Sequence, residues 1–361
     1  MISADQRQQF AEQGYVVTQG LLDVGTDVYS FRDAFIGYLD ALADICVGKT
    51  NSVLRTNYST LTFPERFATL LGCSGGKVMQ HLDPSLSIYI PGYQRDNALP
   101  SAQPPALFQL MRNERLLDAL ETFLGPEISV SSRYHLNLKL SRQHMAIAAS
   151  IAAAVGQIVP QDSRWNFHIG TTPWHRDSRF GLPDSYCSQI INAWIPITPA
   201  TVETGCLLVE PGSHRLSPER VTVPNTSVPV PAAPGDVIFL HNNIRHAALP
   251  NRSAEEIRWA FNCRYLPTGE PTGQPCLPEF VARSQREPDR ELRDPQLWSN
   301  MWQAALDFLS INPPPRLDQK LNVAEAQAIT MQWRAMTAKY ADWLRLTEKK
   351  HCVLGRETLS R

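Results

Sequence analysis

Three residues in the middle of the chain have the types and spacing of a metal site. His175 and Asp177 lie two positions apart in Trp174-His175-Arg176-Asp177, and His246 follows much later. Alternate residues of a β-strand point to the same face, so a His and an Asp at this spacing can reach one ion. Two imidazoles and one carboxylate on one face of an octahedron suit non-haem Fe(II) and leave other positions open. The pattern predicts a catalytic iron site.

A second His-x-Asp pair shows that this spacing is not diagnostic by itself. It consists of His81 and Asp83, is followed by Pro84, and lies in a part of the chain whose pattern is mainly helical. A helix does not place residues two apart on one face, so we favour the later pair.

The distal ligand has two candidates, His241 and His246. His241 directly follows an expected strand, whereas His246 is followed by a polar turn and then by Arg258 at the start of the next expected strand. We favour His246, because this order puts a guanidinium on the strand next to the metal. Guanidinium groups bind carboxylates through two parallel charge-assisted hydrogen bonds. The alternative for Arg258 is a surface ion pair.

The segment Ile128–Leu140 changes to a period of two. Tyr and Leu residues alternate with polar ones, among them His135, Asn137 and Lys139. The alternation predicts a strand with one apolar face and one face that carries functional groups.

Other segments predict a fold of antiparallel strands with helices at both ends. Short strand-like runs recur at residues 189–195, 205–209, 236–241 and 258–266, separated by Pro, Gly and Asn turns. This spacing is typical of sandwiches and jelly rolls. Residues 28–124 have mainly helical periodicity.

The two ends of the chain carry helix signals. Ser3 or Asp5 can cap a first helix that ends at Gly14 and is followed by a strand. Asp294-Pro295 begins a helix that Asn312 and three prolines end. A last helix has one apolar stripe, formed by Ile329, Trp333, Met336, Tyr340 and Trp343. We expect this stripe to pack on the chain's own barrel, with a homodimer interface as the alternative.

Composition excludes several classes of protein. The net charge is −1 and the pI about 6.8, which gives no field that would attract nucleic acid or an anionic membrane. The apolar stretch Met145 to Val155 is about half of the roughly 20 residues that a membrane span needs, so we expect a buried or amphipathic helix. The polar N-terminus lacks a secretory signal, which predicts a cytoplasmic protein. The seven cysteines form no CxxC pair, which excludes a zinc ribbon and argues against a disulfide framework.

Six segments together carry a resemblance to a known family. They are Trp174-His175-x-Asp177, Asn192–Ile195, Glu203–Leu207 with Glu210–His214, Pro234–Asp236 ahead of His246, and Asn251-x-Ser253 ahead of Arg258. In this combination the chain resembles the phytanoyl-CoA dioxygenase family, strongly over residues 130–266 and weakly over 1–20. The family consists of oxygenases that depend on Fe(II) and 2-oxoglutarate.

The resemblance implies a mixed α+β fold whose core is a double-stranded β-helix, a cupin-like jelly roll with helices around it. We expect a single oxygenase domain over residues 1–361. It would consist of a mainly helical part at 1–125, the core at 126–268 and a helical extension at 269–361. An insertion at 141–173 inside the core would be a lid, since long ordered loops are often functional.

The resemblance also implies roles for particular residues. Iron would be bound by His175, Asp177 and His246. Arg258 would bind the distal carboxylate of 2-oxoglutarate, and Lys139 and Trp194 match positions that contact this co-substrate. A solvated side chain is the alternative for Lys139. Halogenating relatives replace the metal-binding carboxylate with a small residue, so the presence of Asp177 favours hydroxylation or a related oxidation.

The expected activity is therefore oxidation of a small-molecule metabolite or natural-product intermediate, using Fe(II), 2-oxoglutarate and O2 and releasing succinate and CO2. An acyl-CoA substrate is an alternative, although no basic cluster near the site suits its phosphates. A non-catalytic jelly-roll binding module is another, against which the triad and Arg258 argue. Possible substrate contacts are His135, Asn137, Arg179, Phe180 and His168.

Ala248 and His214 are two further positions for which the sequence gives an expectation. Many relatives have a Ser where this chain has Ala248, so one hydrogen bond to the co-substrate would be missing or supplied elsewhere. His214, in the segment Pro-Gly-Ser-His, is interpreted as a turn residue and not as a ligand.

Overall fold

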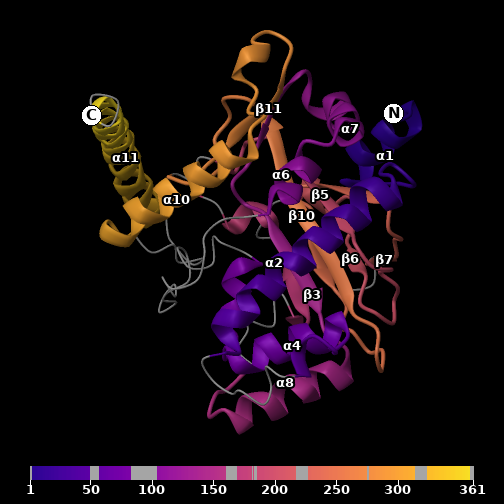
Figure 1. The fold of residues 1–361 in the computed structure, drawn as a ribbon. Coiled ribbons are helices and arrows are strands. Elements are labelled where there is room, and N and C mark those ends of the chain that lie inside the picture. Colours follow the sequence, from indigo (N-terminus) through magenta and orange to yellow (C-terminus); the bar gives the residue numbers. More distant parts are fainter. Residues whose placement is uncertain are drawn as a thin grey trace.

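Two antiparallel sheets form the centre of the molecule, and helices lie outside them (Figure 1). The computed structural model describes residues 2–48, 57–82, 104–159, 169–180, 182, 185–216, 227–274, 276–313 and 323–357. The prediction of a mixed α+β protein with a jelly-roll core is confirmed.

The larger sheet has seven strands in the order β1-β8-β5-β10-β2-β11, with β3 also paired to β10. These strands are β1 (Tyr15–Thr18), β2 (Glu127–Val130), β3 (His135–Lys139), β5 (Ile191–Pro196), β8 (Val237–His241), β10 (Arg258–Pro267) and β11 (Phe280–Ser284). The smaller sheet has the order β4-β9-β6-β7. Its strands are β4 (Thr172–His175), β6 (Leu207–Val209), β7 (Val228–Val230) and β9 (His246–Ala248).

The expected single strand at Ile128–Leu140 is two strands, β2 and β3, that pair with opposite ends of β10. Val130 is opposite Tyr265 and His135 is opposite Asn262. Four residues separate Val130 from His135, whereas only two separate Asn262 from Tyr265 on β10. The segment between β2 and β3 therefore has two residues more than the part of β10 that it faces. The extra residues bulge out of the ladder, which interrupts the strand without disturbing its alternation.

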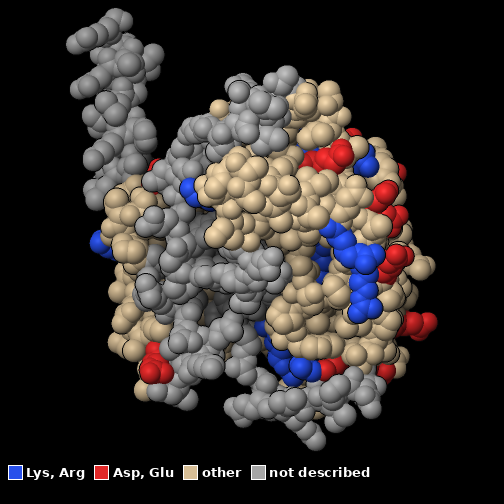
Figure 2. Space-filling model, turned by 90° about the horizontal axis from the view of Figure 1, so that it is seen from below, with Lys and Arg blue, Asp and Glu red and all other residues tan. Residues whose placement is uncertain are grey.

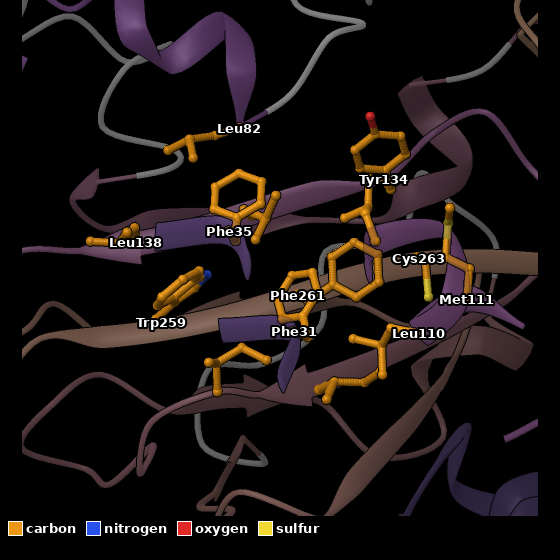
Figure 3. Close-up of a cluster of buried hydrophobic side chains, with 14 of the residues drawn as sticks. Phe31, Phe35, Leu82, Leu110, Met111, Tyr134, Leu138, Trp259, Phe261 and Cys263 are labelled. Carbon is orange, nitrogen blue, oxygen red and sulfur yellow. The ribbon is translucent and has the colours of Figure 1, made fainter. Parts of the chain in front are cut away.

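Strand β10 shows how the alternation separates a core face from a site face. Trp259, Phe261 and Cys263 point toward the helices and belong to the main hydrophobic cluster, as Figure 3 shows. The residues between them point into the space between the two sheets. Ala260 lies there in a second apolar cluster, together with Trp194 of β5.

The helices that cover the larger sheet come mainly from the N-terminal third. They are α1 (Ala4–Gln13), the π-helix η1 (Val24–Tyr29), α2 (Ser30–Cys46), α4 (Phe63–Cys73), the 3-10 helix η2 (Lys77–His81), α6 (Pro105–Met111) and α7 (Glu114–Leu124). Ser3 caps α1 and Gly14 ends it at φ 79, as predicted. The mainly helical prediction for residues 28–124 is confirmed for the described part of that range.

Helix α2 packs directly on the outer face of β10 (Figure 3). The rings of Phe31 and Phe261 have their centroids 5.4 Å apart, and those of Phe35 and Trp259 are 5.8 Å apart. Truncating a buried Phe of this kind to Ala typically costs about 3–5 kcal/mol. This packing holds β10, and with it the side chains on its other face, in a fixed position.

The expected lid insertion begins with α8 (Arg142–Ala154), which packs on α4. Its buried residues His144, Ala148 and Ala152 recur every four positions along one face, as an amphipathic helix requires. The backbones approach closely, because a Cβ on Gly72 would lie 2.6 Å from the carbonyl oxygen of Ala148. Residues 160–168 of the insertion lie outside the described residues, so the lid stays a prediction.

The C-terminal extension contains α10 (Pro295–Ile311) and the long α11 (Val323–Glu357). Asp294 caps α10 and Asn312 ends it, as predicted. The apolar stripe of α11 packs on its own chain, and its contacts are with α10. The ring centroids of Tyr340 and Trp343 lie 5.0 and 5.9 Å from that of Phe308 in α10. Figure 1 shows α11 extending from α10 away from the barrel, and a homodimer through it stays a prediction.

Charges of both signs lie on one face of the molecule. Figure 2 shows Lys and Arg side chains gathered at several places on this face, with Asp and Glu near them. No helix in the described ranges is long and apolar enough to span a bilayer.

Candidate active site

The paired strands β4 and β9 bring two histidines together at one mouth of the barrel. His175, the last residue of β4, is opposite His246, the first residue of β9. Asp177 follows at the start of the short 3-10 helix η3 (Asp177–Phe180). Its carboxylate oxygens lie 3.8 Å from Nε2 of His175 and 3.7 Å from Nε2 of His246. The three ligand atoms all lie within 4.8 Å of one another, close enough to share one ion.

Backbone carbonyls orient both imidazoles. Nδ1 of His175 lies 2.8 Å from the carbonyl oxygen of Pro173, and Nδ1 of His246 lies 3.1 Å from that of Ile244. An Nδ1–H that donates to a carbonyl leaves the Nε2 lone pair free for a metal. Burial lowers the pKa of His175 to about 3, so this imidazole is neutral, the form that binds metals.

Two side chains that sequence reasoning missed hold the carboxylate of Asp177. Nη2 of Arg264 donates to Oδ1 at 2.7 Å, and Nδ2 of Asn192 donates to Oδ2. Burial alone would raise the pKa of Asp177, but the charge of Arg264 holds it well below its usual range. A signal was present in the sequence, because Asn192 is a polar residue inside an apolar strand and Arg264 lies two positions after Asn262.

A third missed residue lies beside this group. Nη1 of Arg133 donates to the backbone oxygen of Asp177 at 3.2 Å. Arg133 precedes β3 in the connection from β2, and it continues the polar alternation of His135, Asn137 and Lys139, a signal that could have nominated it.

His241 lies away from the metal group. Its ring is 5.0 Å from that of His214, and its Nδ1 accepts a hydrogen bond from the backbone N–H of Asn243. Burial lowers its pKa to about 4. His214 is in the short 3-10 turn η5 (Ser213–Arg215), where its Nε2 lies 3.2 Å from the carbonyl oxygen of Ala11.

The histidine of the earlier His-x-Asp pair does not lie on a strand. His81 ends the 3-10 helix η2, and Asp83 lies outside the described residues. Among the described residues that could form metal sites, the group of His175, Asp177 and His246 is the one found.

Two buried basic side chains, called the cation pair below after their charge in the presence of a bound anion, lie on the neighbouring sheet. Arg258 of β10 is directly opposite Lys139 of β3, and their side chains are 1% and 0% exposed. Nε of Arg258 donates to the carbonyl oxygen of Gly205 at 3.1 Å, while Nη1 has no hydrogen-bond partner in the described part of the chain. The guanidinium carbon lies 5.5 Å from the ring centroid of Trp194. Burial lowers the pKa of Arg258 to about 9, so it stays charged at neutral pH.

The metal group and Arg258 line one cavity, and Lys139 lies directly opposite Arg258 on the neighbouring strand. Residues of both sheets line it: His135, Asn137, Thr172, His175, Asp177, Trp194, Leu207, His246, Ala247, Ala248, Arg258 and Asn262. The buried Oδ1 of Asn262 is another polar atom without a partner among the described residues. A polar ligand at these walls would satisfy both Nη1 of Arg258 and Oδ1 of Asn262.

The expected substrate contacts have different positions. His135 and Asn137 line the cavity. Nε2 of His135 lies 3.1 Å from Nη2 of Arg264, so His135 belongs to the network that supports Asp177. The backbones of Arg179 and Phe180 form η3 directly after Asp177, but their side chains and all of His168 lie outside the described part.

The donor sets fit the groups that the sequence predicted. Two imidazole nitrogens and a carboxylate on one side of a cavity suit Fe(II) with open positions, whereas structural zinc sites are closed by four ligands and Ca²⁺ prefers oxygen. The cation pair, with its free guanidinium N–H groups, suits the far carboxylate of a dicarboxylic acid.

Comparison with known proteins identifies similar sequences. The phytanoyl-CoA dioxygenase (PhyH) family model matches residues 92–260, which contain the metal group and the cation pair. A 1-deoxypentalenic acid 11-beta-hydroxylase from Streptomyces arenae is 29% identical over 125 residues, a match that covers 28% of this chain and 43% of the hydroxylase. The chain thus matches less than half the length of that relative.

Two solved structures share the fold over most of the chain. The non-heme monooxygenase ThoJ in its apo form has a TM-score of 0.51 at 15% identity, covering 93% of this chain and 98% of ThoJ. Its nickel complex has a TM-score of 0.50 at 17% identity, covering 90% and 98%. At such identities the likeness establishes the fold of this chain.

Proposed function

The chain belongs to the phytanoyl-CoA dioxygenase (PhyH) family over residues 92–260, and from this premise we propose that it is an Fe(II)- and 2-oxoglutarate-dependent oxygenase. The observation that carries the proposal is one cavity that is lined both by a two-His, one-carboxylate group and by Arg258, with the buried Lys139 directly opposite Arg258. Iron bound there would supply the activation of O2 that couples the oxidation of a substrate C–H bond to the conversion of 2-oxoglutarate into succinate and CO2.

In this proposal each residue has a defined task. Nε2 of His175, Nε2 of His246 and the carboxylate of Asp177 hold iron, with Arg264 and Asn192 orienting the carboxylate. The cation pair binds the distal carboxylate of 2-oxoglutarate. Its second cation compensates for the missing hydroxyl at position 248, and Trp194 closes the wall beside it against water.

We further propose a small-molecule natural-product intermediate as substrate, hydroxylated at carbon. The support is the similarity to a hydroxylase whose name specifies a carboxylic acid, together with the retained Asp177. The single domain over residues 1–361, the cytoplasmic location and the homodimer remain predictions. An acyl-CoA substrate remains an alternative that the same assay tests.

The proposal is tested by adding Fe(II) and 2-oxoglutarate to the purified protein without oxygen and recording the charge-transfer absorbance of the complex. Succinate release is then measured in air with a panel of terpenoid and polyketide acids and acyl-CoA thioesters. We expect wild type to bind 2-oxoglutarate only with metal present, and His175→Ala to lose the absorbance band. A wild-type protein that binds neither metal nor 2-oxoglutarate would instead be a non-catalytic jelly-roll module.

A further inference from the structure

Lys139 and Arg258 form an arrangement that proteins usually avoid. They occupy directly opposite positions on β3 and β10, both are buried, and in the described part of the chain neither forms an ion pair with a carboxylate. Like charges directly opposite each other destabilise a sheet, and an uncompensated buried charge costs more still. One of the two groups must therefore give up its charge or receive a counter-ion.

The groups that face Lys139 supply no negative charge. Nζ lies 2.7 Å from the carbonyl oxygen of Leu249 and 3.4 Å from that of Ala248, at the end of strand β9 of the other sheet. The thiol of Cys206, next to β6, is buried, and burial raises its pKa, so it is neutral. The remaining charged neighbour is Arg258 on β10.

Lysine is the member of the pair that can become neutral. A guanidinium keeps its proton in proteins, whereas an ammonium loses its proton readily when it is buried. Burial first, and then the charge of Arg258, hold the pKa of Lys139 well below its usual range. Both carbonyl contacts of Nζ can be made by a neutral amine, which still has two N–H donors.

Resting on the proposed function, we propose that Lys139 is uncharged in the empty cavity and takes up one proton when the distal carboxylate of 2-oxoglutarate binds beside Arg258. The carboxylate offsets the charge of Arg258 and gives the ammonium an acceptor, so the charged form of Lys139 becomes the favoured one. Binding of 2-oxoglutarate is then coupled to the uptake of a proton, so the Kd of 2-oxoglutarate depends on pH.

The coupling has a definite sign. A complex that holds one proton more than its free components is weakened as pH rises, and its Kd increases by up to about tenfold per pH unit. This dependence applies between the pKa of Lys139 in the free protein and its pKa in the complex.

Isothermal titration calorimetry measures the proton count directly. The full-length protein is first saturated with Co(II), so that imidazole protons displaced by the metal have already been released. 2-Oxoglutarate is then titrated in phosphate and in Tris at one neutral pH. The difference in heat between buffers of different ionisation enthalpy gives the protons bound. We expect uptake of about one proton per 2-oxoglutarate in wild type and about zero in Lys139→Met, which keeps the side-chain volume.

Lys77→Met is the matched control, because Lys77 is an exposed lysine of η2 outside the cavity, and it should give the wild-type count. Wild-type binding without proton uptake, or the same uptake in Lys139→Met, would overturn the proposal. If wild type does not bind 2-oxoglutarate at all, the proposed function itself is wrong. The number of protons that wild type takes up can be measured whether or not the variants fold. If Lys139→Met does not fold, Lys139→Gln is used in its place.

Discussion

The guanidinium of Arg264 lies 2.7 Å from the carboxylate of Asp177, and both side chains are 2% exposed. Asp177 therefore has a charge partner whether or not a metal is bound. Because Asn192 holds the other oxygen, the carboxylate is kept both ionised and oriented toward the two imidazoles. The site is preorganised for a cation by side chains that need not touch it.

Arg264→Leu should destabilise the metal-free protein strongly. Removing one partner of a buried ion pair leaves the other charge uncompensated and typically costs about 3–5 kcal/mol. Urea unfolding in EDTA measures this loss, and added Co(II) should restore part of it by supplying a new counter-charge. Arg290→Leu, which breaks an ion pair with Glu287 that is 60% exposed on both sides, should cost far less, because water screens both charges. Equal losses in the two variants would contradict the assigned role of Arg264.

His246→Ala and His241→Ala should separate the two candidates for the distal ligand. Loss of a direct ligand should weaken metal binding by more than the roughly 10–100-fold typical of outer-shell changes. His241 lies against His214 and not beside Asp177, so His241→Ala should bind metal as wild type does. Competition with a metallochromic indicator gives both affinities. A larger loss in His241→Ala would mean that the wrong histidine has been assigned.

Arg258→Gln should weaken 2-oxoglutarate binding and leave metal binding unchanged. Hydrogen bonds to charged groups contribute about 1.5–3 kcal/mol, which corresponds to roughly a 10- to 150-fold increase in Kd. Arg258→Lys retains a charge but loses the bidentate geometry, so its Kd should lie between those of Arg258→Gln and wild type. Calorimetry of the Co(II)-loaded variants provides the values. An unchanged Kd in Arg258→Gln would place the distal carboxylate elsewhere.

The stability of the metal-free protein should fall on acidification partly because of His241. Its pKa is about 4 in the folded protein, where burial and the N–H of Asn243 favour the neutral ring, against 6.5 for an ordinary histidine. Between these values the unfolded chain binds the additional proton, so the free energy of unfolding decreases as pH falls through this window. The slope from one such group is at most about 1.4 kcal/mol per pH unit.

His241→Gln removes this titration while retaining an acceptor for Asn243. Urea unfolding in EDTA at several pH values between 4 and 6.5 should show a shallower decrease in the variant than in wild type. Parallel curves would show that His241 does not contribute to the acid sensitivity.

Local patterns in the sequence determined the secondary structure and most of the chemistry. The cap at Ser3 and the turn at Gly14 need only neighbouring residues, as does the alternation that put Lys139 on the polar face of β3. The sequence also nominated His175 and Asp177, because a strand places residues two apart on the same face.

Only the tertiary structure decided which distant residues meet. The register between β4 and β9 brought His246 rather than His241 to Asp177, and the register between β3 and β10 placed Lys139 opposite Arg258. The pairing of Arg264 with Asp177 and the packing of α11 on α10 were equally unreadable from local patterns. The physical reason is that strand register and helix docking depend on packing between segments far apart in the chain, and the periodicity of one segment does not specify its partner.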